Sequence, residues 1–164
     1  MSTEAALSIR DLKVTFKTLL GNVQAVRGVS LDVQPGEVLG VVGESGSGKS
    51  VSFLSVMGLL GRNAIVEGSA KVGDTELVGA NARTMRKVRG NDVAMIFQDP
   101  LSALNPVHRV GAQVAEMLLA HQHGMSKDAA AKRAVELLDL VGIPQPEQRA
   151  RQYAHEFSGG MRQR

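Results

Sequence analysis

The chain has no cysteine and no tryptophan, and aromatic residues make up only 3% of its 164 residues. The absence of cysteine excludes disulfide bonds, thiolate metal sites and a cysteine nucleophile. With so few aromatic residues, the sequence offers no stacking platform for single-stranded nucleic acid. No apolar run approaches the roughly 18 residues that a membrane-spanning helix needs. We therefore expect a globular domain in a reducing, cytoplasmic compartment.

An excess of charge is also lacking. The net charge is +3, from 19 basic and 16 acidic residues, which is too small to indicate a nucleic-acid partner. The local basic cluster of Arg83, Arg86, Lys87 and Arg89 is interpreted as one solvated helix face, with a docking role as the alternative. Because 43% of the residues are hydrophobic, the chain has enough apolar side chains to form a core.

Residues 43–50 fit the pattern G-x-x-x-x-G-K-[ST], which is typical of a phosphate-binding loop. The loop directly follows the apolar run Val38–Val42, a predicted buried strand, and precedes a predicted helix, Val51–Leu60. In this context the backbone N–H groups of a glycine-rich loop surround phosphate oxygens. A flexible Gly/Ser turn is the alternative. The predicted nucleotide-binding residues are Gly43, Glu44, Ser45, Gly46, Ser47, Gly48, Lys49 and Ser50.

Each residue type in this loop suits a different part of a nucleoside triphosphate. Gly43, Gly46 and Gly48 can take positive φ and carry no β-carbon, so the backbone can wrap closely around the phosphates. The Lys49 ammonium is expected to reach the β- and γ-phosphates, and the Ser50 hydroxyl is suited to binding Mg²⁺. The expected cofactors are ATP and Mg²⁺.

Short β segments dominate the first part of the chain, and helices dominate the second. We expect strands at Leu7–Phe16, Val23–Val33, Val38–Val42, Ser69–Val72, Glu76–Val78 and Val93–Phe97, and a helix at Ala82–Arg89. A loop is predicted around Gly21-Asn22 and a hairpin turn at Gly73-Asp74. Further helices are predicted at Val110–Gln122 and, with Ser126 as its N-cap, up to Gly142.

A second glycine motif lies near the end of the sequence. In Phe157–Arg164, Ser158 and two glycines, Gly159 and Gly160, precede a segment that is compatible with a helix. Backbone donors at such a helix start can bind an anion. Taken alone, the motif is also explained by a plain N-cap or turn.

Together, these motifs resemble the nucleotide-binding subunit of ATP-binding-cassette (ABC) transporters. Gly43–Ser50 is similar to the Walker A motif, Gln98 to the Q-loop glutamine and Ser158–Gly160 to the signature motif, although the family's usual signature has Gln where this chain has Met161. The resemblance implies an α/β fold: a P-loop NTPase core with an N-terminal antiparallel β-subdomain and an inserted α-helical subdomain. The implied divisions are residues 1–98, 99–157 and 158–164.

The resemblance also implies how the site works. A second ABC ATPase subunit would pair head to tail with this one, and ATP would lie between the Walker A loop of one and Ser158, Gly159 and Gly160 of the other. Gln98 would contact Mg²⁺ and the attacking water, so Gln98 and Lys49 are the predicted catalytic residues. Phe16 is a candidate for stacking on adenine; its alternative is a core residue at a strand end.

The segments Phe97–Pro106 and Phe157–Arg164 are similar to the oligopeptide/dipeptide importer branch of the family. This similarity implies an ATPase at the cytoplasmic face of the inner membrane. Its partners would be two transmembrane permease subunits and a periplasmic or extracellular substrate-binding protein, with no nucleic acid. The alternatives are a nickel or glutathione importer, a soluble ABC-type ATPase acting on ribosomes or DNA, and a simple P-loop kinase or GTPase.

The sequence ends six residues after Ser158. In the family, the Walker B aspartate, the catalytic glutamate, the D-loop and the switch histidine would follow this point. We therefore expect a truncated chain that binds ATP but hydrolyses it poorly.

Overall fold

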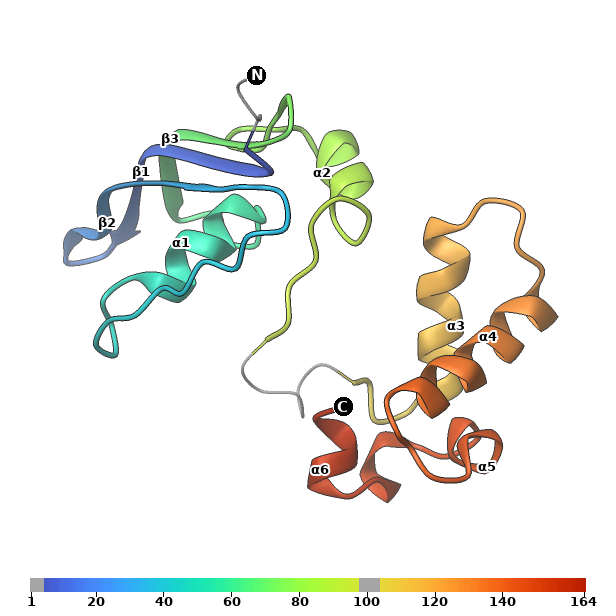
Figure 1. The fold of residues 1–164 in the computed structure, drawn as a ribbon. Helices are drawn as coiled ribbons and strands as arrows, with labels where there is room; N and C mark the ends of the chain where they lie inside the picture. The colour runs from blue at the N-terminus through green and yellow to red at the C-terminus, as the bar shows by residue number, and fades with distance from the viewer. Residues whose placement is uncertain (1–4, 98–103) are drawn as a thin grey trace. The chain divides into compact units, whose positions relative to one another are not determined.

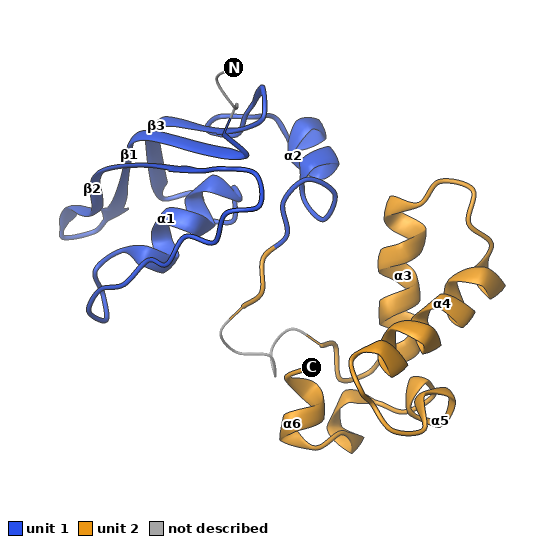
Figure 2. Cartoon of the chain, viewed as in Figure 1, with its two compact units in different colours: residues 1–94 blue, residues 95–164 orange. Residues whose placement is uncertain are grey.

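The structure, a computed structural model, describes residues 5–97 and 104–164 and divides the chain into two compact units (Figure 2). Unit 1 comprises residues 1–94 and unit 2 residues 95–164. The predicted boundary between residues 98 and 99 falls outside the described residues and stays a prediction.

Unit 1 is built on a four-stranded antiparallel sheet with the order β2-β1-β3-β4. The strands are β1 (Leu7–Thr18), β2 (Gly21–Val33), β3 (Ala64–Val72) and β4 (Thr75–Glu76). The turn predicted at Gly73-Asp74 joins β3 to β4. The loop predicted at Gly21-Asn22 is wrong, because both residues belong to β2 and pair with Thr18 and Lys17. The turn lies instead at Leu19-Leu20, whose side chains are fully exposed.

Two short helices cover one face of this sheet (Figure 1). They are α1 (Lys49–Val56) and α2 (Ala82–Val88). Val56 from α1 and Met85 and Val88 from α2 pack with Ile9 and Leu12 of β1, both of which have no exposed surface. This core fixes α1, and thus the loop before it, against the sheet.

Two predicted strands are absent from the described residues. Residues 37–44 have no regular secondary structure, and of Val93–Phe97 only Val93 forms a bridge, to Arg89. Val42 is 94% exposed and Ile96 98% exposed. A strand needs a hydrogen-bonded neighbour, and no described strand pairs with either run.

Unit 2 consists of helices. They are α3 (Val110–His121), α4 (Lys127–Leu140), α5 (Pro146–Ala150), a 3-10 helix (Ala154–Glu156) and α6 (Gly159–Arg162). The predicted N-cap of α4 is confirmed, since the Ser126 side chain accepts a hydrogen bond from Ala129 N at 3.1 Å. A core of Val110, Leu138, Ile143, Ala154 and Phe157 holds the helices together. In the described parts of the chain, no helix combines the length and apolar character that crossing a bilayer requires.

Candidate functional site

The glycine-rich segment 43–48 forms an exposed loop that leads directly into α1. Gly46 has a φ of 81° and Gly48 a φ of 92°, values that side-chain-bearing residues rarely adopt. A β-carbon at Gly48 would lie 2.7 Å from the carbonyl oxygen of Ala25 in β2. Glycine is therefore required at position 48 for two reasons: the positive φ and the close approach of the backbone to the sheet. Of the three glycines in this loop, Gly46 and Gly48 adopt a positive φ and Gly43 does not.

The ammonium group of Lys49 lies inside the curve of this loop. Its Nζ donates to the carbonyl oxygens of Gly43 at 2.6 Å and Glu44 at 2.7 Å, and to Ser47 Oγ at 3.2 Å. Gly43 leaves room for this arrangement, because a β-carbon there would lie 2.9 Å from Ser47 Oγ. The loop thus gathers three oxygen atoms around one positive charge.

The N-terminus of α1 is not capped by a side chain, as is also true of α3 and α5. No acidic residue lies in the first turn of α1. By contrast, side chains cap α2 (Asn81), α4 (Ser126) and α6 (Ser158). The first N–H groups of a helix have no intrahelical acceptor, and the helix dipole favours a negative charge beside them. The start of α1 thus leaves its donors available to an anion, and the glycine loop with the Lys49 ammonium lies beside it.

Ser50 is the second residue of α1 and is exposed, so the helix begins two residues before the predicted Val51. Lys49 is half-buried, whereas Glu44, Ser45 and Ser47 are exposed. All eight predicted loop residues therefore lie together at the start of α1.

The second glycine motif lies in unit 2 and starts α6. Ser158 Oγ accepts from Met161 N at 3.3 Å, which matches the predicted cap. Ser158, Gly159 and Gly160 are all exposed, and a β-carbon at either glycine would meet no atom within 4 Å. The exposed side of this short turn is therefore accessible to another molecule.

The two remaining predicted site residues have different outcomes. Gln98 lies outside the described residues. Phe16 is half-buried in β1, where it is paired with Val23 of β2 and Ala64 of β3. Its position in the centre of three strands leaves both of its predicted roles, base stacking and packing, open.

Comparison with known proteins establishes the family. Residues 26–164 match the model of the family described as ABC transporter. The chain belongs to the ABC transporter family. Its fold is similar to that of the ATP-binding cassette MJ0796, solved as a dimer in a post-hydrolysis state bound to ADP and Pi: the TM-score is 0.78 at 22% identity, over 95% of this chain and 65% of that one. The predicted α/β P-loop fold class is confirmed.

Curated relatives are more similar in sequence. The chain is 53% identical to the oligopeptide transport ATP-binding protein OppD of Mycobacterium tuberculosis, over 96% of this chain and 26% of the relative. It is 50% identical to OppD of Bacillus subtilis, over 96% of this chain and 44% of the relative. The chain thus spans half or less of the length of these relatives.

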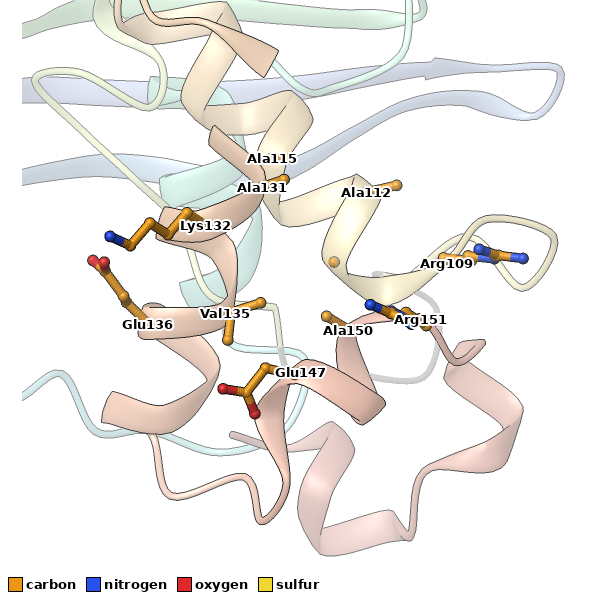
Figure 3. A pocket seen from close by; sticks show the side chains of 11 residues that line it. Arg109, Ala112, Ala115, Ala131, Lys132, Val135, Glu136, Glu147, Ala150 and Arg151 are labelled. Carbon is orange, nitrogen blue, oxygen red and sulfur yellow. The ribbon is translucent and has the colours of Figure 1, made fainter. Parts of the chain in front are cut away.

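One surface feature of this ABC family member has no counterpart in the sequence predictions. An open groove of about 640 Å³ lies between α3, α4 and α5 in unit 2 (Figure 3). Small side chains form its floor and charged ones, including Arg109, Lys132, Glu147 and Arg151, stand around it. The sequence signal for this groove is the alanine-rich face of each of the helices α3 and α4. Alanine at these positions predicts that two helices pack closely, but it does not predict a ligand.

Proposed function

We propose that this chain is part of the ATP-binding subunit of an ABC importer that powers the uptake of di- or oligopeptides across the cytoplasmic membrane. The family match supports the ABC assignment, and the names of the curated relatives support peptide transport. The α1 loop supports ATP as the ligand.

The observation that carries the proposal is the position of the Lys49 ammonium at the uncapped start of α1. A triphosphate placed there meets one cation, the free N–H groups of the loop and the positive end of the helix. Each hydrogen bond to a charged group is worth about 1.5–3 kcal/mol, whereas the dipole adds only about 0.3–1. Lys49 and the loop amides thus dominate the affinity. We assign the Ser50 hydroxyl to Mg²⁺, with Gln98 as its companion ligand.

The other assignments follow the resemblance to the family. Ser158, Gly159 and Gly160 contact the γ-phosphate of ATP held by a second cassette, and their exposure leaves them accessible to that partner. Phe16 stacks on adenine. Two permease subunits and a substrate-binding protein complete the importer, and the ATPase sits on the cytoplasmic face of the membrane.

Replacing Lys49 by alanine tests the nucleotide site. We expect Lys49→Ala to weaken ATP binding on the order of 100-fold or more, because the charge that meets the β- and γ-phosphates is lost. Calorimetric titration with Mg-ATP measures the effect. Lys127→Ala, at an exposed lysine that begins α4, is the matched control and should bind as the unchanged chain does. Equal affinity of both variants would reject the loop as the nucleotide site.

The transported substrate is tested with the intact importer. Full-length protein, co-purified with its permease subunits, should show ATPase activity that rises on addition of a peptide together with its binding protein. Nickel and glutathione, each with a cognate binding protein, are the comparison substrates. Stimulation by one of these alone, or salt-sensitive association with ribosomes or DNA in place of permeases, would overturn the peptide-importer assignment.

A further inference from the structure

The C-terminal end of α1, opposite the phosphate-binding loop, has an incomplete cap. Leu59 N donates to Leu54 O at 2.9 Å and Gly58 N donates to Ser55 O at 3.0 Å. With Gly58 at a φ of 60°, this is a Schellman motif, which satisfies two of the final carbonyl groups. The carbonyls of Met57 and Gly58 take no part in it and need donors from elsewhere.

Arg89, just after α2, supplies both donors. Its Nε donates to Met57 O at 2.8 Å and its Nη2 to Gly58 O at 2.7 Å. A guanidinium group at this end also interacts favourably with the helix dipole. A β-carbon at residue 58 would lie 2.9 Å from Nη2, so the contact depends on glycine. Arg89 is therefore no part of the solvated face predicted for the basic cluster: it is half-buried and clamps α1.

The contact with Arg89 stabilises α1, which is too short to be stable alone. Its eight residues span about 12 Å, and a helix of this length is not stable alone in water. Gly48 packs against Ala25 at one end of α1 and Arg89 binds its other end, and between them lie three buried side chains, those of Ser52, Ser55 and Val56. A change in the direction of its axis moves the N–H groups of the loop and the Lys49 ammonium together.

We propose that Arg89 is a positioning residue for the phosphate-binding loop, holding α1 at the orientation in which its N-terminus receives polyphosphate; this rests on the proposed function of that loop. Arg89 also begins the tight turn 89–93, in which Gly90 N donates to Val93 O at 2.8 Å. This turn leads into the segment that contains Gln98.

Affinity for Mg-ATP tests the proposal, with Arg89→Ala, Arg89→Lys and Arg86→Ala in the full chain. Arg86 is the matched control, because it is exposed and donates to Ala82 O within its own helix. We expect Arg89→Ala to weaken binding on the order of 10-fold, as is typical of coupling between two sites. Arg89→Lys should fall between it and the unchanged chain, since one ammonium cannot reproduce the two-pronged contact. Arg86→Ala should bind normally.

Amide hydrogen exchange separates positioning from a general loss of stability. Without nucleotide, Arg89→Ala should increase the amide exchange rates of residues 43–52 more than those of β1. If Arg89 has a purely structural role, the ratio of the exchange rates in these two regions should stay as it is in the unchanged chain. If Arg89→Ala does not fold, Arg89→Lys decides by the same two measurements. Normal affinity, or an unchanged exchange ratio, in the variant that decides would overturn the proposal. Lys49→Ala distinguishes a failure of this proposal from a failure of the proposed nucleotide site. If Lys49→Ala also binds Mg-ATP normally, the loop is not the nucleotide site. If Lys49→Ala loses affinity but the Arg89 variant does not, only the role of Arg89 is refuted.

Discussion

The strands of unit 1 and the two apolar runs 38–42 and 93–97 were all predicted to be strands, but their structures differ. Ile9 and Leu12 in β1 have no exposed surface, whereas Val42 and Ile96 are almost completely exposed. Each long strand of the sheet has an antiparallel neighbour, and β1 reaches β2 through a two-residue turn. Continuous apolar runs of this kind are typical of strands in parallel sheets, whose partners are brought by long crossovers. An apolar run therefore becomes a strand only where a neighbour is available to pair with it.

The largest expected effect contrasts the two regions directly. Leu12→Ala should lower the free energy of unfolding by about 2–5 kcal/mol, because it leaves a cavity in the core of unit 1. Val42→Ala should change it by no more than about 0.5 kcal/mol, because that side chain is already in solvent. Urea unfolding followed by circular dichroism measures both. A comparable loss from Val42→Ala would break the comparison, since it would mean that the run is buried in solution.

A smaller effect tests how the edge of the sheet is held. The carboxylate of Glu76 in β4 accepts hydrogen bonds from the Ser69 hydroxyl and from the backbone N–H groups of Ala70 (2.9 Å), Leu77 (3.1 Å) and Val78 (2.9 Å). Burial raises the pKa of Glu76, but these hydrogen bonds together outweigh it and leave the pKa below its ordinary value of 4.5. The ionised form is therefore favoured by the fold.

The sign of the pH dependence follows. Because the pKa is lower in the folded state, the stabilisation is complete above pH 4.5 and is lost as the pH falls through the lower folded-state pKa. Glu76→Gln should cost about 1–3 kcal/mol at pH 7 and should flatten the acid limb of the stability curve. Glu67→Gln, at an exposed carboxylate on β3, is the control and should keep the wild-type limb. Stability curves of equal slope for Glu76→Gln and the unchanged chain would contradict this account.

The smallest expected effect concerns an element that local signals specify. Ser126→Ala removes the acceptor for Ala129 N at the start of α4 and should cost about 1 kcal/mol. Ser126→Asp should retain most of the stability, because aspartate is an equally good N-cap. Thermal unfolding of the two variants gives the difference. Identical midpoints would show that packing, rather than the cap, determines where α4 begins.

Local chemistry explains which predictions succeeded. The caps at Ser126 and Ser158 and the turn at Gly73-Asp74 depend on neighbouring residues, and each is present where the sequence predicted it. The loop at Gly21-Asn22 was wrong because β1 continues to Thr18, so its pairing with β2 moves the turn to Leu19-Leu20. The sequence analysis did not predict helix α5. This helix has only five residues, and it follows Gln145, whose φ of 55° is not predicted by any local sequence pattern.

In the candidate site too, features set by neighbouring residues were predicted and features set by distant contacts were not. The motif at residues 43–50 identified the loop, but the bonds from Lys49 to the carbonyls of Gly43 and Glu44 are a matter of conformation that the pattern does not contain. The contact of Arg89 with Met57 and Gly58 joins residues about thirty positions apart, so sequence reasoning assigned Arg89 to solvent. The role of Gln98 stays a prediction because it falls outside the described residues.

The hydrogen bonds that surround the Lys49 ammonium compensate its charge when the proposed nucleotide site is empty. Three oxygen atoms of the chain itself hold this cation, so an arriving phosphate substitutes one set of oxygens for another instead of stripping a lysine of water. A departing ligand likewise leaves no uncompensated charge behind. In the proposed nucleotide site, the lysine therefore keeps acceptors of its own, which lowers the electrostatic cost of the empty state between release of one ligand and binding of the next.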